Sequence, residues 1–463
     1  MTSETHSGFT KILGRVDVFL LGVVATFNLN LVPTIAGSGK VMLPLMLAAV
    51  LLFVIPQAIA VVQINRRFPG EGGMAEWVSY HFGDFWGFLT AWCYWGINVV
   101  YVPTLILFFI GNLSFLLQGN QSSESLNTLP IFLAALVLLW LIVGLSVVGF
   151  GVSRWLSNAG GIGMLTALVV LLTLCGWSMA TGRAVQADVM PSLAFDWSSV
   201  ATFGVICMAL VGPELGTVIG DEIQESRSVV PWSVWRVAIL AAVCYTLGAG
   251  VLQLAVPTAT IHSVQGVLAA AQSIAEPLEA QWLVSLLGTL ICVSVIGASV
   301  TWFAGASRML WVAAHDGSLP APLATLSPRF GTPVAALVLQ GVLSTAILAI
   351  SFVGSQAQQV FTTLVDLSVV LQLIPFLTLF VGLFRAGLVE RNEHSKVFML
   401  AGAAGALASL AGILLAFVPS RQVESVWMHE LNLIGGCVLF VGSCVVLFAM
   451  RRKPTNMTNE PEA

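Results

Sequence analysis

Charged residues are scarce along this chain. Only 9% of its 463 residues are Asp, Glu, Lys or Arg, whereas 57% are hydrophobic. Soluble proteins carry about 25% charged residues, so this chain has too few charges to keep a globule of its size in solution. Apolar runs with almost no charge recur along the whole chain. This pattern predicts an all-α polytopic membrane protein.

Several other classes lack their signatures. A formal net charge of -4 gives no sign of a nucleic-acid partner. The six histidines are scattered without an HExxH or paired-acid pattern, which argues against a membrane enzyme, and we expect no cofactor or metal. A channel would need rings of charge or of filter carbonyls. We interpret all cysteines as small buried hydrophobic residues: Cys93, Cys175, Cys207, Cys244, Cys292, Cys437 and Cys444.

The apolar runs divide into membrane spans joined by polar links. We predict about twelve transmembrane helices, at 16–38, 41–65, 84–117, 128–149, 155–178, 198–221, 230–256, 281–313, 332–353, 359–384, 397–418 and 428–450. The tract "GSGK" ends at Lys40 and hints at a phosphate loop. That motif would require glycine at 34 and Ser or Thr at 41, where the chain has Thr34 and Val41. We therefore predict an external turn at "GSGK".

Basic residues are distributed unequally between the two sides of the membrane. When the N-terminus is placed in the cytoplasm, only Lys40, Arg183 and Arg421 of the 18 Lys and Arg residues fall outside. This bias predicts a cell (inner) membrane protein with both termini cytoplasmic. The transporter domain would cover 16–450, between tails at 1–15 and 451–463. Arg308, near the cytoplasmic end of its span, is expected to snorkel.

Two spans contain helix-breaking sequences. The first span carries Asn28, Asn30 and Pro33, and the sixth carries "ALVGPELG" with Gly212 and Pro213. Proline removes a helical hydrogen bond, and in a membrane the freed backbone groups are tolerated where they line a cavity. Two unrelated proline kinks would be the alternative.

The two breaks lie at similar depths. In each span an acidic residue at the start precedes the proline. The pair is Asp17 and Pro33 in the first span, and Asp196 and Pro213 in the sixth. Corresponding breaks indicate an inverted-repeat transporter with its site at the bilayer midplane. We predict a 5+5 fold with repeats at about 16–178 and about 198–384. Two peripheral helices would follow at about 397–450.

Other polar residues inside the spans are candidates for function. Glu214 could change protonation and couple transport, or it could accept freed backbone N–H groups. Asp366 lies near the start of its span, which favours a structural role, with coupling or gating as the alternative. Asn98, Ser299 and Trp302 could line a pocket or could pack between helices. The small residues of "SNAGGIGMLT" predict close helix packing.

Three longer stretches resemble the amino acid–polyamine–organocation (APC) superfamily of permeases. These are "FPGEGGMAEWVSYHFGDFWGF", "LVGPELGTVIGDEIQESRSVVPWSV" and "ASRMLWVAAHDGSLPAPLATLSPRFGTPVAAL". The wording of "VPTIAGSG", "EGGMAEWVS" and "VDLSVVLQLIPF" is most similar to the glutamate:GABA antiporter branch. The resemblance implies the five-plus-five fold and amino acid transport by alternating access, by exchange or coupled to protons. Transport of polyamines or other organic amines is the alternative.

The resemblance also implies a substrate site. Substrate would meet the unwound backbone of two helices, at Asn28, Leu29 and Asn30 and at Val211, Gly212 and Pro213. The partners would be an amino acid and the lipid bilayer, and the protein would be a monomer or a homodimer.

The sequence departs from the family at two places. Asn28-Leu29-Asn30 replaces a common Gly-x-Gly, and Met208 stands where arginine exchangers often have an aromatic residue. We expect this protein's own specificity to arise there.

Overall fold

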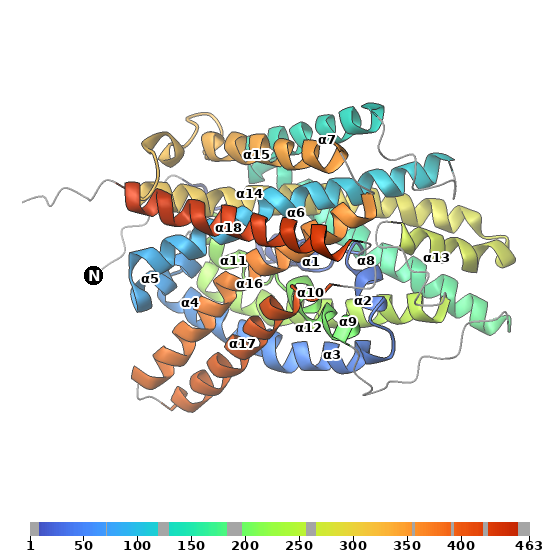
Figure 1. Ribbon diagram of the computed structural model, residues 1–463, viewed down its shortest axis with the longest axis horizontal. Helices are drawn as coiled ribbons and strands as arrows, with labels where there is room; N and C mark the ends of the chain where they lie inside the picture. Colours follow the sequence, from blue (N-terminus) through green and yellow to red (C-terminus); the bar gives the residue numbers. More distant parts are fainter. Residues whose placement is uncertain are drawn as a thin grey trace, which may run out of the picture.

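The computed structural model describes residues 9–70, 72–118, 129–182, 197–255, 265–353, 357–389, 393–419 and 425–451. Regular structure in these ranges is helical, and most of the long helices run along the longest axis of the molecule (Figure 1). The predicted fold class is confirmed.

Within the described ranges, ten helices are long and apolar enough to cross a membrane. Together with the two broken spans, they account for the twelve predicted segments. One is the compound span Gly39–Arg67, built from η1 (Gly39–Val41), α3 (Met42–Ala49), the π-helical η2 (Val50–Val54) and α4 (Ile55–Arg67). The others are α6 (Asp84–Gln118), α7 (Leu129–Val148), α8 (Phe150–Ala180), α12 (Ser226–Ala255), α14 (Gln281–His315), α15 (Val334–Val353), α16 (Ala357–Val389), α17 (Ser395–Leu415) and α18 (Val426–Met450).

The first and sixth spans are broken where the sequence predicts. The first consists of α1 (Arg15–Thr26) and α2 (Val32–Ala36), with Phe27 to Leu31 between them. The sixth consists of α9 (Trp197–Val200), α10 (Thr202–Ala209) and α11 (Leu215–Val218), with the non-helical segment 210–214 before α11. Pro33 lies in the first turn of α2, where its missing N–H costs nothing.

The segments between spans are more structured than the sequence suggests. The short helices α5 (Gly73–Phe82) and α13 (Gly266–Ala275) were not predicted. Both are too short to cross a bilayer. "GSGK" runs into the single turn η1, which confirms that it joins the first two spans.

The small-residue face of α8 lets three helices approach one another closely. A methyl group added at Gly161 would lie 2.9 Å from the Leu20 carbonyl oxygen of α1. On α14, a methyl group at Gly297 would lie 2.7 Å from the Leu156 carbonyl oxygen and 3.0 Å from the Gly160 Cα. The predicted packing role of "SNAGGIGMLT" is confirmed.

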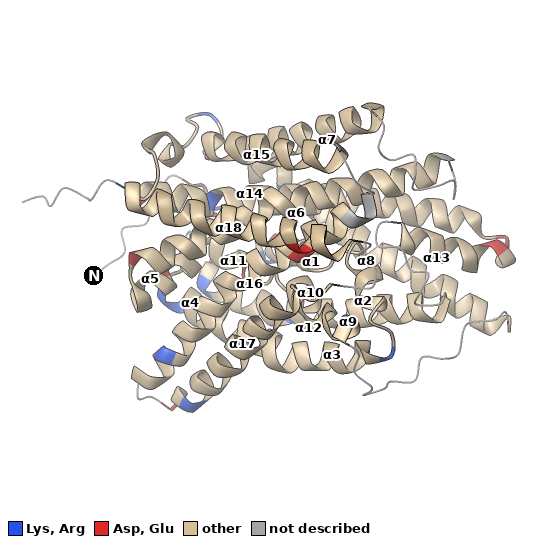
Figure 2. Ribbon diagram, viewed as in Figure 1, with Lys and Arg blue, Asp and Glu red and all other residues tan. Residues whose placement is uncertain are grey.

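Basic residues gather at one end of the molecule. In Figure 2 most of the basic segments lie toward the end that holds α5, whereas one lies beside α3 toward the other end. Five of the basic residues used for the orientation prediction lie outside the described ranges: Arg183, Arg391, Arg421, Arg452 and Lys453.

Replacement of Gly297 tests the close packing. Gly297→Ala should lower the free energy of unfolding by about 1–3 kcal/mol, because the new methyl group meets backbone that cannot move aside alone. Unfolding in detergent micelles measures the change. Gly176→Ala on α8 is the matched control, since nothing lies within 4 Å of its added methyl group. Equal effects of the two changes would contradict the packing role.

Candidate functional site

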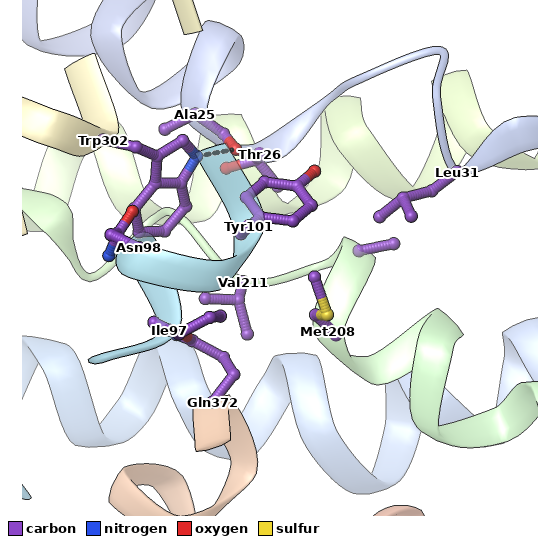
Figure 3. Close-up of a pocket in the computed structure, with 11 residues that line it drawn as sticks. Ala25, Thr26, Leu31, Ile97, Asn98, Tyr101, Met208, Val211, Trp302 and Gln372 are labelled. Carbon is purple, nitrogen blue, oxygen red and sulfur yellow. Dashed lines mark hydrogen bonds between the residues drawn. The ribbon is translucent and has the colours of Figure 1, made fainter. Parts of the chain in front are cut away.

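A small cavity lies between the two broken spans (Figure 3). Its walls come from α1, α6, α10, the segment after α10, α14 and α16. The lining residues are Ala25, Thr26, Leu31, Ile97, Asn98, Tyr101, Met208, Ala209, Val211, Trp302 and Gln372. The cavity volume is about 20 Å³, enough for a water molecule. An amino acid would enter only if the walls moved apart.

The break in the first span leaves backbone groups without partners. Within the described part of the chain, the N–H groups of Leu29 and Asn30 donate no hydrogen bond. Leu29 and Asn30 are fully buried, and Leu31 lines the cavity. Unpaired buried N–H groups are rare in proteins, so these two donors need an explanation.

The side chains of both asparagines are held by the protein. The Asn28 Nδ2 donates to the Val24 carbonyl oxygen at 3.0 Å, so this side chain caps the end of α1. The Asn30 amide exchanges hydrogen bonds with the Tyr101 hydroxyl, at 3.2 Å and 3.4 Å. The Tyr245 hydroxyl accepts from the Asn28 N–H at 3.0 Å and donates to the Thr26 carbonyl at 2.9 Å.

Gly212 brings the second break into contact with the end of α1. Its φ of 134° is a conformation that L side chains rarely adopt. A methyl group there would clash with the Thr26 Oγ1 and would lie 2.9 Å from the Thr26 nitrogen. The "ALVGPELG" break therefore needs glycine at this position for both backbone conformation and space.

The Glu214 carboxylate is surrounded by donors. It accepts from the Gly212 N–H at 2.7 Å, from the Gln57 Nε2 at 3.0 Å and from the Tyr94 hydroxyl at 3.0 Å. The side chain is fully buried. If the carboxyl took up a proton, the Tyr94 hydroxyl and a rotated Gln57 amide could each accept it, whereas the Gly212 N–H could not. The network has the polar groups for either protonation state.

The structure brings some predicted residues to the cavity and places others elsewhere. Asn98, Met208, Val211 and Trp302 line it. Gly212 and Pro213 line a neighbouring cavity on the side of α1 that carries Leu21 and Gly22. The Ser299 hydroxyl is buried without a partner in the described chain, but Ser299 is not among the lining residues.

Asp366 lies apart from this cavity. Its Oδ2 is 3.3 Å from the Nε2 of His429 on α18, and the angle there is not that of a hydrogen bond. This position supports the structural role that its place near the start of the span favours.

Sequence reasoning did not select several residues that line the cavity. Thr26 and Leu31 flank the predicted break and could have been found from it. Ile97 directly precedes Asn98 on α6. Tyr101, in contrast, is a pocket candidate that the third span offers together with Asn98, and it does line the cavity. Gln372 carries no local signal, because an isolated glutamine in an apolar span can equally well face another helix.

A family comparison covers nearly the whole chain. Residues 12–442 match the family described as "Amino acid permease". The chain belongs to the amino acid permease family. It is a multi-pass membrane transporter and not an enzyme, as predicted.

Individual relatives of this permease are distant. It is 27% identical to an uncharacterized transporter of Legionella pneumophila, with 93% of this chain and 95% of the relative aligned. Two Lactococcus lactis proteins also align. A probable agmatine/putrescine antiporter is 22% identical, with 95% of this chain and 93% of the relative aligned. A glutamate/gamma-aminobutyrate antiporter is 24% identical, with 87% of this chain and 83% of the relative aligned.

A solved structure agrees with the fold. The crystal structure of MhsT in complex with L-phenylalanine matches with a TM-score of 0.65 at 14% identity. The match covers 88% of the permease and 99% of MhsT.

The permease is closed at the end that holds α5. Leu13 and Ile223 form an isolated parallel bridge, and the Ile12 and Leu13 N–H groups both donate to the Glu222 carbonyl at 3.0 Å. The Glu222 carboxylate accepts from the Arg308 Nε at 2.9 Å and from its Nη2 at 2.7 Å. The expected snorkelling of Arg308 is wrong, because Glu222 supplies a buried counter-charge.

A second cavity lies at the same end, between α5, α6 and the end of α14. Its volume is about 220 Å³, and its lining includes Glu76, Asp84, Asp316 and Arg451. Burial, together with the negative charges of Asp316 and Asp221, raises the pKa of Glu76 to about 7. This end of the permease therefore holds a carboxyl group that titrates near neutral pH.

The Glu222–Arg308 pair should stabilise the closed end. Glu222→Ala leaves the Arg308 charge buried without its partner, which should lower the free energy of unfolding in detergent by about 3–5 kcal/mol. Glu225→Ala is the matched control. Its carboxylate lies 3.7 Å from Arg15 in an exposed pair, and the loss should stay within about 1 kcal/mol. Similar losses for both variants would show that the buried pair has no special role.

Proposed function

We propose that this permease carries amino acids across the cell membrane by alternating access, as an exchanger or coupled to protons. Both termini would lie in the cytoplasm. The gathering of basic residues at the end that holds α5 supports this orientation (Figure 2).

The unpaired N–H groups of Leu29 and Asn30 carry the proposal. A substrate carboxylate can accept from both of them in a low-dielectric cavity, where such hydrogen bonds are strong. At the second break, the carbonyl oxygens of Leu210 and Val211 accept no hydrogen bond from the described residues. They can accept from the substrate ammonium group. The two breaks together thus offer donors and acceptors for an amino acid backbone.

Alternating access requires the closed end to open. The Leu13–Ile223 bridge and the Glu222–Arg308 pair hold the segment after α11 to the N-terminal segment and to α14. These contacts must separate before substrate can pass on that side. Gly212 links α1 to the break after α10, so movement of one broken span is passed to the other.

Reconstituted protein tests the substrate class. Proteoliposomes should take up radiolabelled amino acid, and amines that lack the carboxylate should compete at least about 10-fold more weakly, because they cannot accept from Leu29 and Asn30. Exchange and net uptake are separated by comparing vesicles with and without internal substrate. Equal competition by decarboxylated amines would favour transport of polyamines or other organic amines. Lack of any transport would refute the proposal.

Glu214→Gln tests whether protonation of the carboxyl couples transport. The variant should transport with a flatter pH profile than the wild type, measured as initial uptake rate between pH 5 and 8 (about the range over which coupling groups titrate). Tyr94→Phe is the control, since it removes one donor and keeps the titratable group. A Glu214→Gln variant with a normal rate and an unchanged pH profile would leave Glu214 as a structural acceptor only.

A further inference from the structure

Gln372 is a buried amide without a hydrogen-bond partner among the described residues. It lies within α16 and is fully buried, and neither its Nε2 nor its Oε1 has a hydrogen-bond partner in the described protein. Its side chain extends from the helix toward Ile97 and Val211 at the cavity (Figure 3). Burial of an unsatisfied amide costs free energy, so a partner supplied by the substrate would recover that cost.

The described lining of the cavity carries no formal charge. None of the described residues that line it is Asp, Glu, Lys, Arg or His. The buried carboxylate of Glu214 already receives three donors and is not part of the lining. A charged substrate side chain would therefore lose its hydration without gaining a counter-ion.

The remaining polar atoms are suited to a neutral polar group. Asn98 Oδ1 and Thr26 Oγ1 are also buried without partners in the described chain, and both residues line the cavity. The Trp302 Nε1 is already committed to the Ala25 carbonyl, at 3.0 Å. An amide such as Gln372 can donate and accept together, which matches a hydroxyl or another amide.

We propose that the substrate is an amino acid with an uncharged polar side chain, and that Gln372 selects it by hydrogen bonding to that side chain. The selection rests on the proposed amino acid transport. The apolar walls formed by Ile97, Met208 and Val211 surround the aliphatic part of the substrate side chain. Such a substrate differs from agmatine and glutamate, which appear in the names of two of the distant relatives.

Pairs of amino acids of similar shape separate the contributions of charge and of hydrogen bonding to substrate selection. In proteoliposomes, glutamine should compete with the transported amino acid at least about 100-fold better than glutamate, and asparagine better than aspartate, because burial of an unpaired charge is unfavourable. Threonine should compete about 10- to 100-fold better than valine, because valine leaves the amide unpaired.

Gln372→Leu tests the role of the side chain itself. The preference for threonine over valine should fall by about 10-fold or more, while valine competes as well as or better than before. Gln340→Leu on α15 is the matched control. Gln340 is also fully buried with both amide atoms unpartnered in the described chain, but it is not part of the cavity lining. It should keep the wild-type preference.

The outcomes distinguish the selection from the proposed function. Transport restricted to glutamate, arginine or other charged amino acids overturns the selection and leaves amino acid transport intact. An unchanged threonine preference in Gln372→Leu, or the same change in Gln340→Leu, also overturns it. A wild-type protein that transports no amino acid refutes the proposed function itself. If Gln372→Leu does not fold, Gln372→Asn gives the same test, because its shorter amide should reduce the preference while it stays polar.

Discussion

Every backbone N–H and C=O group inside a membrane must find a partner, and this requirement organises the permease. Two spans leave their helical hydrogen bonding at 27–31 and at 210–214. Side chains meet much of the loss. From other helices, Tyr245 bonds to the first break and Trp302 to the end of α1, and within the second break Glu214 accepts from the Gly212 N–H. The groups that no side chain reaches are those available to a substrate.

The intact helices hold the two breaks against each other. α8 and α14 pack closely through glycines, and α1 lies against the same face, because Gly161 faces the Leu20 backbone. On the other side, α6 and α16 supply Asn98, Tyr101 and Gln372 to the cavity. The rigid parts thus surround an irregular centre, which is the arrangement that positions binding groups with the least freedom.

The features that follow from local chemistry could be predicted from the sequence. Span positions follow from apolar length, and both breaks follow from Pro, Gly and Asn in otherwise apolar runs. The contents of the site could be predicted only in part. Asn28 caps its own helix and Asn30 bonds Tyr101, because nearby groups compete for these amides. The position of Gln372 at the cavity and the Glu222–Arg308 pair depend on which helix faces meet in the folded protein. These faces belong to residues more than eighty positions apart in the chain, and no local sequence pattern encodes such a contact.

The partners of the first break have a consequence for how the chain is made. Gly212, Tyr245 and Trp302, which contact the end of α1 and its break, are all in the second half of the transporter domain or close to its start. The first segment enters the membrane long before these residues are synthesised, since chains emerge from the ribosome N-terminus first. Until then its carbonyls lack these donors. Biogenesis must therefore shelter this segment from lipid, in the insertion machinery or at the water interface, until the eighth span arrives.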